Sequence, residues 1–148
     1  MSDYKRPVSV LVVIHTPSLN ILLLERALHA GFWQSVTGSQ EDDESLIETA
    51  VREVEEETGI VAPPSAFRDW ELTNNFEIFA EWRHRYAPGV THNSEHVFSL
   101  EVPEDQPVRI APGEHRDQCW LSWREAAAKC FSWSNRDAIL MLPERTAR

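Results

Sequence analysis

Three glutamates in the stretch REVEEETG, Glu53, Glu56 and Glu57, have a spacing that suits metal binding. On a helix, positions i, i+3 and i+4 share one face, within about 100° of arc, so the three carboxylates converge. Carboxylates held this close repel one another unless a cation lies between them. Mg²⁺ takes such oxygen ligands and fills its other positions with water and phosphate oxygens. The spacing therefore predicts a metal site that meets a polyphosphate, with a solvated acidic helix face as the alternative.

The negative charge of the chain is concentrated around these glutamates. Residues 38–60 include nine acidic residues and one basic residue, Arg52, in a chain whose formal net charge is −10. A local cluster of this kind argues against a nucleic-acid-binding surface and favours a cation site. Arg52 is spaced to pair with Glu48 or Glu56 at i,i+4, and such a pairing also fixes the carboxylate rotamers that a metal site needs.

An amphipathic helix is expected to position the glutamates. Ile47, Ala50, Val51 and Val54 follow the i, i+3, i+4, i+7 pattern of a helix that buries one apolar stripe. We therefore expect a helix within residues 44–58, with the three glutamates on a different face from the stripe.

Strand patterns surround this helix. Apolar runs at 8–15 and 20–25 are expected to form a hairpin. Segments rich in Pro, Gly and Asn predict loops at 87–93 and 103–115. Further strands are expected at 32–38, 67–72, 75–83, 95–102 and 118–121.

Two more helices are expected near the C-terminus. One, over 122–130, is predicted to begin with a capping box of Ser122 and Glu125. The other, over 134–142, is predicted to stop at Pro143. Mixed strands flanked by a few helices predict an α+β fold, an α/β/α sandwich around a mixed β-sheet.

Length and composition limit the class of protein. At 148 residues the chain can bury the core of one domain, and we expect a single domain over residues 1–148. No segment approaches the roughly 20 apolar residues of a membrane span. Cys119 and Cys130 do not make a disulfide framework, which is typical of a reducing compartment. We expect a cytoplasmic protein without nucleic-acid or membrane partners, and a monomer, because no exposed apolar helix requires a partner.

The segment from Gly38 to Ile60 resembles the Nudix box at every fixed position. It matches G-x5-E-x7-R-E-U-x-E-E-x-G-U, where U is a bulky aliphatic residue. The resemblance implies a Nudix hydrolase whose loop–helix–loop motif binds Mg²⁺, with Mn²⁺ as a substitute. It implies that the three glutamates bind the metal, that Glu44 and Arg52 orient them, and that Gly38 and Gly59 supply turns, where positive φ is often needed. The implied catalytic residues are Glu44, Arg52, Glu53, Glu56 and Glu57.

Stretches outside the box resemble one bacterial branch of the family, whose members hydrolyse dihydroneopterin triphosphate to the monophosphate and pyrophosphate in folate biosynthesis. Many Nudix proteins have Pro-Gly-Gly before the box and Gly where this chain has Asp43, so the departure also points to a particular branch. The resemblance covers about residues 4–140. Its stretches are YKRPVS (4–9), FWQSVTGS (32–39), FEIF (76–79), RHRYAPGVTHN (83–93) and WSNRDAI (133–139).

A pterin triphosphate requires cations for its phosphates and an aromatic slot with a few polar groups for its ring. Arg136 is a further candidate cation, and Phe32 and Trp33 are further candidates for the slot. The resemblance implies that Glu114, in the loop 103–115, is an additional metal ligand; an ordinary surface glutamate is the alternative. The expected substrate-binding residues are Lys5, Arg26, Thr37, Phe76, Glu77, Phe79, Trp133 and Asn135.

Two other functions stay open. A Nudix pyrophosphohydrolase acting on canonical or oxidised (deoxy)nucleoside triphosphates needs the same metal helix and aromatic slot. A catalytically silent nucleotide-binding module is expected to lose a glutamate of the box, and this chain keeps all of them.

Overall fold

The strands of the computed structural model, which describes residues 4–146, are β1 (Val8–His15), β2 (Asn20–Arg26), β3 (Trp33–Gln34), β4 (Val36–Ser39), β5 (Phe67–Glu77), β6 (His92–Glu101) and β7 (His115–Ser122). Within these residues they form one sheet with the order β3-β2-β1-β6-β5, and β4 and β7 pair with β1 and β2. β1 and β6 are parallel, whereas β1–β2, β2–β7 and β5–β6 are antiparallel. The mixed sheet predicted from the sequence is confirmed.

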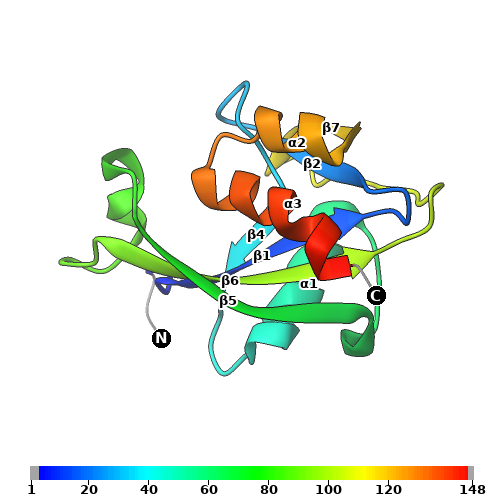
Figure 1. Cartoon of the computed structure of the whole chain (residues 1–148). Coiled ribbons are helices and arrows are strands. Elements are labelled where there is room, and N and C mark those ends of the chain that lie inside the picture. Colours follow the sequence, from blue (N-terminus) through cyan, green and yellow to red (C-terminus); the bar gives the residue numbers. More distant parts are fainter. Residues whose placement is uncertain (1–3, 147–148) are drawn as a thin grey trace.

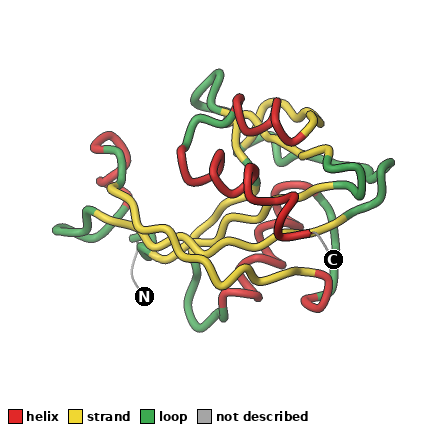
Figure 2. The backbone as a smooth tube through the Cα atoms, in the orientation of Figure 1, coloured by secondary structure: helices red, strands yellow, loops and turns green. Residues whose placement is uncertain are grey.

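Helices cover both faces of the sheet. α1 (Leu46–Thr58) lies on one face, and α2 (Trp123–Lys129) and α3 (Trp133–Thr146) lie on the other (Figure 1). Figure 2 shows the same three layers, with the yellow strands between red helices. This is the α/β/α sandwich that the sequence predicts. None of the helices within residues 4–146 is long and apolar enough to cross a membrane.

β1 contributes to the cores on both sides of the sheet. Val10 and Val12 pack in the core beneath α1, and Leu11 and Val13 pack in the core beneath α2 and α3. All four side chains are at most 2% exposed. Burying each of them stabilises the fold by about 1.5–3 kcal/mol. A strand buried on both faces has a continuous apolar sequence, which explains the apolar run at 8–15.

Local hydrogen bonds define both ends of α1. The Ser45 hydroxyl accepts a hydrogen bond from the Glu48 amide (3.3 Å), and the Glu48 carboxylate accepts one from the Ser45 amide (2.8 Å), which makes a capping box. Gly59 ends the helix in the left-handed conformation, with φ of 75°. The apolar stripe predicted on this helix packs against the sheet, as expected.

Several predicted strand boundaries are wrong. The strands expected at 67–72 and 75–83 are one continuous strand, β5, with a bulge near its middle. The residues that follow form a 3₁₀ turn, η2 (Ala80–Arg85). The strand expected at 32–38 is two short strands, β3 and β4. Aromatic-rich segments fit a strand pattern even where tertiary contacts make them a turn.

Both predicted helix-end signals near the C-terminus are also wrong. Pro143 does not stop α3, which continues to Thr146. Proline removes one backbone donor, which costs least near a helix end, and the Thr146 hydroxyl donates a hydrogen bond to the Leu142 carbonyl (2.9 Å). Ser122 does not form a capping box, because its hydroxyl donates to the Glu125 carboxylate (2.7 Å) and makes no cap hydrogen bond to the helix backbone.

We expect Ser45→Ala to lower the free energy of unfolding by about 1 kcal/mol, because it removes the hydroxyl that caps α1. Urea denaturation measures this difference. Ser65→Ala is the matched control, since Ser65 is exposed in the 3₁₀ turn η1 (Pro64–Ala66), and it should change the value by less than about 0.5 kcal/mol. A Ser45→Ala protein as stable as the control contradicts the capping role.

Candidate active site

One cleft of about 1330 Å³ joins the acidic side of α1 to the N-terminal end of α3. The residues expected to bind metal or substrate line it, apart from the slot candidates Phe32 and Trp33, although they come from all parts of the chain. They are Lys5, Arg26, Thr37, Glu53, Glu56, Glu57, Phe76, Glu77, Phe79, Glu114, Trp133, Asn135 and Arg136. Their convergence is a structural fact, whereas their roles stay predictions.

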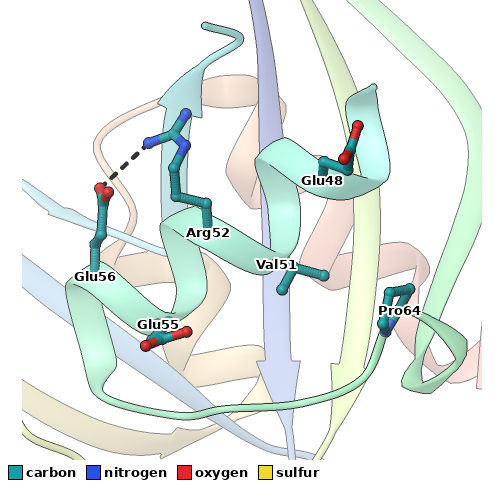
Figure 3. Close-up of a pocket in the computed structure, with 6 residues that line it drawn as sticks. All are labelled: Glu48, Val51, Arg52, Glu55, Glu56 and Pro64. Carbon is teal, nitrogen blue, oxygen red and sulfur yellow. Dashed lines mark hydrogen bonds and ion pairs between the residues drawn. The ribbon is translucent and has the colours of Figure 1, made fainter. Parts of the chain in front are cut away.

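Arg52 holds the carboxylates at the acidic end in place. Its guanidinium donates two hydrogen bonds to Glu44, at 2.5 Å and 2.9 Å, and one each to Glu53 (2.6 Å) and Glu56 (3.2 Å). Figure 3 shows the Arg52 and Glu56 side chains on the same side of α1. The hydrogen bonds from Arg52 lower the pKa of Glu44 to about 2, and those to Glu44 raise the pKa of Arg52. Both groups therefore stay charged at neutral pH, as a positioning role requires.

Gly38 is required because the Glu53 carboxylate approaches it closely, and not because of its backbone angle. A Cβ built at Gly38 would lie 2.1 Å from Cδ of Glu53 and 2.3 and 2.5 Å from its two carboxylate oxygens. The expectation of positive φ is therefore wrong for Gly38, whereas Gly59 does have it. The missing side chain lets the Glu53 carboxylate lie directly against β4.

The Glu57 carboxylate is buried without a hydrogen-bond donor. Its side chain is 1% exposed, and neither oxygen has a hydrogen-bond partner within residues 4–146. Burial first, and then the carboxyl groups of Glu53 and Glu114, raise the pKa of Glu57 well above its usual range. The smallest effect, from the Thr37 backbone, opposes this shift, and the Thr37 amide lies outside hydrogen-bond geometry. A buried carboxylate without a donor is costly, and a bound cation removes that cost. The orphaned oxygens fit a metal ligand.

Glu114 and His115 complete a cluster around Glu57. One ligand atom from each of the three side chains lies within 4.8 Å of the others, and His115 Nε2 is 3.7 Å from Glu57 Oε1. Burial, followed by the charge of Arg26, lowers the pKa of His115 to about 4, so the imidazole is neutral at pH 7. Carboxylate oxygens with one neutral imidazole suit a divalent cation. The sequence analysis missed His115, whose only signal was its position beside Glu114.

Among the described residues, five cations line the same cleft, and three of them, Lys5, Arg26 and Arg85, lie close enough to repel one another. Lys5 lies at the exposed mouth of the cleft. Desolvation of its ammonium by the surrounding protein, followed by repulsion from Arg85 and Arg26, lowers its pKa. Burial and then Arg85 lower the pKa of Arg26. Cations that repel one another inside a cleft favour a polyanionic ligand. Arg85 was not among the expected substrate-binding residues, because the run Arg83-His84-Arg85 also fits a solvated strand edge.

Aromatic rings form a contiguous cluster in the cleft wall. Phe79, Trp82 and Phe131 have ring centroids 5.0–6.4 Å apart. Only Phe79 was predicted, since Trp82 belongs to the unexpected turn η2 and Phe131 to the link between α2 and α3. The expectation that Phe32 and Trp33 line the slot is wrong: Phe32 stacks against Phe131 at 4.8 Å, and neither residue is among those that line the cleft.

The polar side chains predicted to contact a ring already bond within the protein. Thr37 donates to a backbone carbonyl of β1 (3.0 Å), and Glu77 pairs with Arg83 (3.0 Å). The Asn135 side chain accepts from the Ser35 amide (2.7 Å) and donates to the Ser35 hydroxyl (3.0 Å). These two bonds fix the start of α3 to the break between β3 and β4.

Two further polar residues of β6, Asn93 and Glu95, form what we call the cleft floor. Their side chains are 4% and 5% exposed, and Asn93 Oδ1 and Glu95 Oε1 have no hydrogen-bond partner in the described part of the chain. Burial raises the pKa of Glu95 to about 7, opposed by a hydrogen bond with Ser134. The sequence analysis missed both residues, because Asn93 ends a segment predicted to be a loop and Glu95 is a polar residue of a predicted strand, where such side chains normally face water.

The chain belongs to the NUDIX domain family, whose model matches residues 5–142. It is 48% identical over 139 residues to the dihydroneopterin triphosphate diphosphatase of Escherichia coli K12, covering 92% of this chain and 91% of that protein. It is 43% identical over 142 residues to the Haemophilus influenzae protein of the same name, covering 94% and 89%. The solved structure of the E. coli dihydroneopterin triphosphate pyrophosphohydrolase has a TM-score of 0.90 at 43% identity, covering 98% of this chain and 100% of that chain. The predicted family and fold are confirmed.

We expect Gly38→Ala to weaken metal binding more than it destabilises the fold. The added Cβ meets the flexible end of Glu53, which can move only by breaking its hydrogen bond with Arg52. Affinity for Mn²⁺, measured by titration calorimetry, should fall about 10- to 100-fold, while the free energy of unfolding changes by about 1 kcal/mol or less. Gly113→Ala is the matched control for stability, because its Cβ meets nothing within 4 Å. Unchanged Mn²⁺ affinity in Gly38→Ala contradicts the close-approach argument.

We expect Glu95 to make stability fall with rising pH. Its pKa is about 7 in the fold and near 4.5 in the unfolded chain, so the folded state holds more protons between these values. Its contribution is fully present below about pH 4.5 and is lost by about pH 7, a loss of about 3 kcal/mol in the free energy of unfolding. Glu95→Gln lacks this titration, so its stability relative to the wild type should rise across that window in urea denaturation. The exposed Glu101→Gln, on the same strand, should show no such rise. If the difference in the free energy of unfolding between Glu95→Gln and the wild type does not change with pH, the raised pKa of Glu95 is contradicted.

Proposed function

We propose that this chain is a Mg²⁺-dependent pyrophosphohydrolase that cleaves dihydroneopterin triphosphate to dihydroneopterin monophosphate and pyrophosphate in folate biosynthesis, with Mn²⁺ able to replace Mg²⁺. The observation that carries the proposal is a single cleft that contains an acidic cluster, a group of cations that includes Lys5, Arg26 and Arg85, and an aromatic wall. The relatives named for this substrate, which match over 92% and 94% of the chain, support it. A single domain over residues 1–148, acting as a cytoplasmic monomer on a small-molecule triphosphate, completes the proposal.

The glutamates of α1 and the loop before β7 are the proposed metal ligands. They are Glu53, Glu56, Glu57 and Glu114, with His115 beside them. A divalent metal bound there supplies neutralisation of phosphate charge and polarisation of a water molecule. The orphaned oxygens of Glu57 are the structural observation in favour of this set.

The other polar residues hold the substrate and the glutamates. Lys5, Arg26 and Arg85 bind phosphate oxygens, which relieves the repulsion among the three cations. Arg52 and Glu44 fix the carboxylates by the hydrogen bonds described above. Hydrolysis adds one water across a P–O–P bridge and releases pyrophosphate. A glutamate of the box or Glu114 accepts the proton of that water.

A product assay with Mg²⁺ tests the proposal. The purified protein is given dihydroneopterin triphosphate, dATP, dGTP or 8-oxo-dGTP at equal concentration, and pyrophosphate and orthophosphate are measured separately. Preference for the pterin with release of pyrophosphate is the expected result. Equal or faster turnover of a deoxynucleotide overturns the proposed substrate and favours a broader nucleoside triphosphate pyrophosphohydrolase. No turnover of any compound overturns the enzymatic function and favours a silent binding module.

We expect Glu57→Gln to lower kcat/KM by at least about 100-fold, because even groups behind metal ligands contribute 10- to 100-fold. The substitution removes a charge and little volume, so the protein should stay folded, as thermal unfolding in EDTA will show. Glu55→Gln is the matched control: Glu55 is an exposed glutamate of α1 outside the cleft lining, and its substitution should leave kcat/KM within about twofold of the wild type. Near-normal turnover by Glu57→Gln contradicts the metal assignment.

A further inference from the structure

The cleft floor presents two buried hydrogen-bond acceptors side by side. Asn93 and Glu95 are two positions apart on β6, so their side chains point to the same face of the sheet, about 7 Å apart along the strand. The Asn93 amide nitrogen donates to the Ser9 hydroxyl (2.8 Å), which fixes the side chain and leaves Oδ1 unpartnered in the described residues. Both residues line the cleft, so a ligand can reach them.

These acceptors are suited to N–H donors and not to a metal. Glu95 belongs to no cluster of three metal-binding side chains within residues 4–146. No lysine or arginine is among the groups that shift its pKa. An ionised carboxylate accepts hydrogen bonds through both oxygens and donates none. A ligand group with two neighbouring N–H donors therefore complements Glu95.

The surroundings of the floor fit a flat ring. Trp133 and Phe131 line the same cleft, and Trp133 directly precedes Ser134, whose hydroxyl bonds with Glu95. Aromatic side chains stack on flat rings, and a few polar groups at the base of such a slot fix the orientation of the ring. The metal-binding glutamates and the cations lie in the same cleft, so one ligand can place its ring on the floor and its phosphates among these charged groups.

We propose that the Glu95 carboxylate accepts two hydrogen bonds from the ring N–H and the adjacent exocyclic amine of a 2-amino-4-oxopyrimidine ring, with the Asn93 amide oxygen beside it. The inference rests on the proposed function, because the pterin ring contains this edge. Guanine presents the same pair of donors. Adenine has an acceptor nitrogen where these rings have N–H, and hypoxanthine lacks the exocyclic amine, so both leave an oxygen of the buried carboxylate without a donor. Glu95 is thus the residue that selects the ring.

Binding of monophosphates tests the inference without turnover, because these compounds cannot release pyrophosphate. Titration calorimetry in Mg²⁺ compares 7,8-dihydroneopterin monophosphate, GMP and IMP, the last two differing only by the exocyclic amine. The wild type should bind the pterin compound, and should bind GMP about 10-fold or more tightly than IMP. Glu95→Gln should bind the pterin compound about 10- to 100-fold more weakly and lose the preference for GMP, since its amide presents one donor to the ring donors.

Glu101→Gln is the matched control, an exposed glutamate at the end of the same strand, and should bind the pterin compound within about twofold of the wild type. Glu95→Gln removes a buried charge, so thermal unfolding at pH 8 should show a fold at least as stable as the wild type. Binding by Glu95→Gln within twofold of the wild type, or a retained preference for GMP, overturns the inference.

The product assay separates failure of this inference from failure of the proposed function. A wild type that fails to hydrolyse dihydroneopterin triphosphate, yet binds the ring in a Glu95-dependent manner, overturns the proposed reaction and supports the inference. Pyrophosphate release with no dependence of ring binding on Glu95 overturns the inference alone.

Discussion

The hydrogen bonds of Arg52 allow an acidic helix to fold against the sheet. The guanidinium contacts carboxylates from the loop before α1 and from two turns of the helix, so one cation reduces the repulsion of three glutamates. These contacts also fix where the carboxylates point. The approach of Glu53 to Gly38 then places one of them against β4. A lysine offers a single charge without the planar set of donors and cannot satisfy these partners together.

The arrangement leaves Glu57 outside the reach of Arg52. Its carboxylate is buried beside Glu114 and His115, and no donor of the described chain compensates it. The fold therefore carries a local cost at this position, which is the usual relation between stability and a functional site. Glu95, at the other end of the cleft, is likewise a buried carboxyl with an unpartnered oxygen, and burial raises its pKa. Two buried carboxyls with unpartnered oxygens, one suited to a cation and one to N–H donors, give the cleft different chemistry at its two ends.

The sequence predicted the parts of the molecule that depend on local spacing. The helix with its three glutamates follows from the 3.6-residue period, and the layered α+β fold follows from the alternation of strands and helices. The resemblance to one branch of the family, outside the Nudix box, added Glu114, which the structure brings beside Glu57. Asn93 and Glu95 could not be found in this way, because their importance comes from where α3 begins above β6 and not from their neighbours in sequence. The turn η2 was missed for a similar reason, since its aromatic residues satisfy a strand pattern until their contacts are known.

The hydrogen bonds between Asn135 and Ser35 join residues 100 positions apart. Contacts of such long range form slowly, because the chain between them must first lose conformational freedom. The ends of α1 are fixed by its own caps, so this helix can form early. The part of the cleft lined by Trp133 forms only when α3 docks on the break between β3 and β4. We therefore expect a folding chain to pass through a stage in which the acidic helix is formed and the ring-binding end is still open. In such a stage the glutamates of α1 are already in place before the cleft can select a ring.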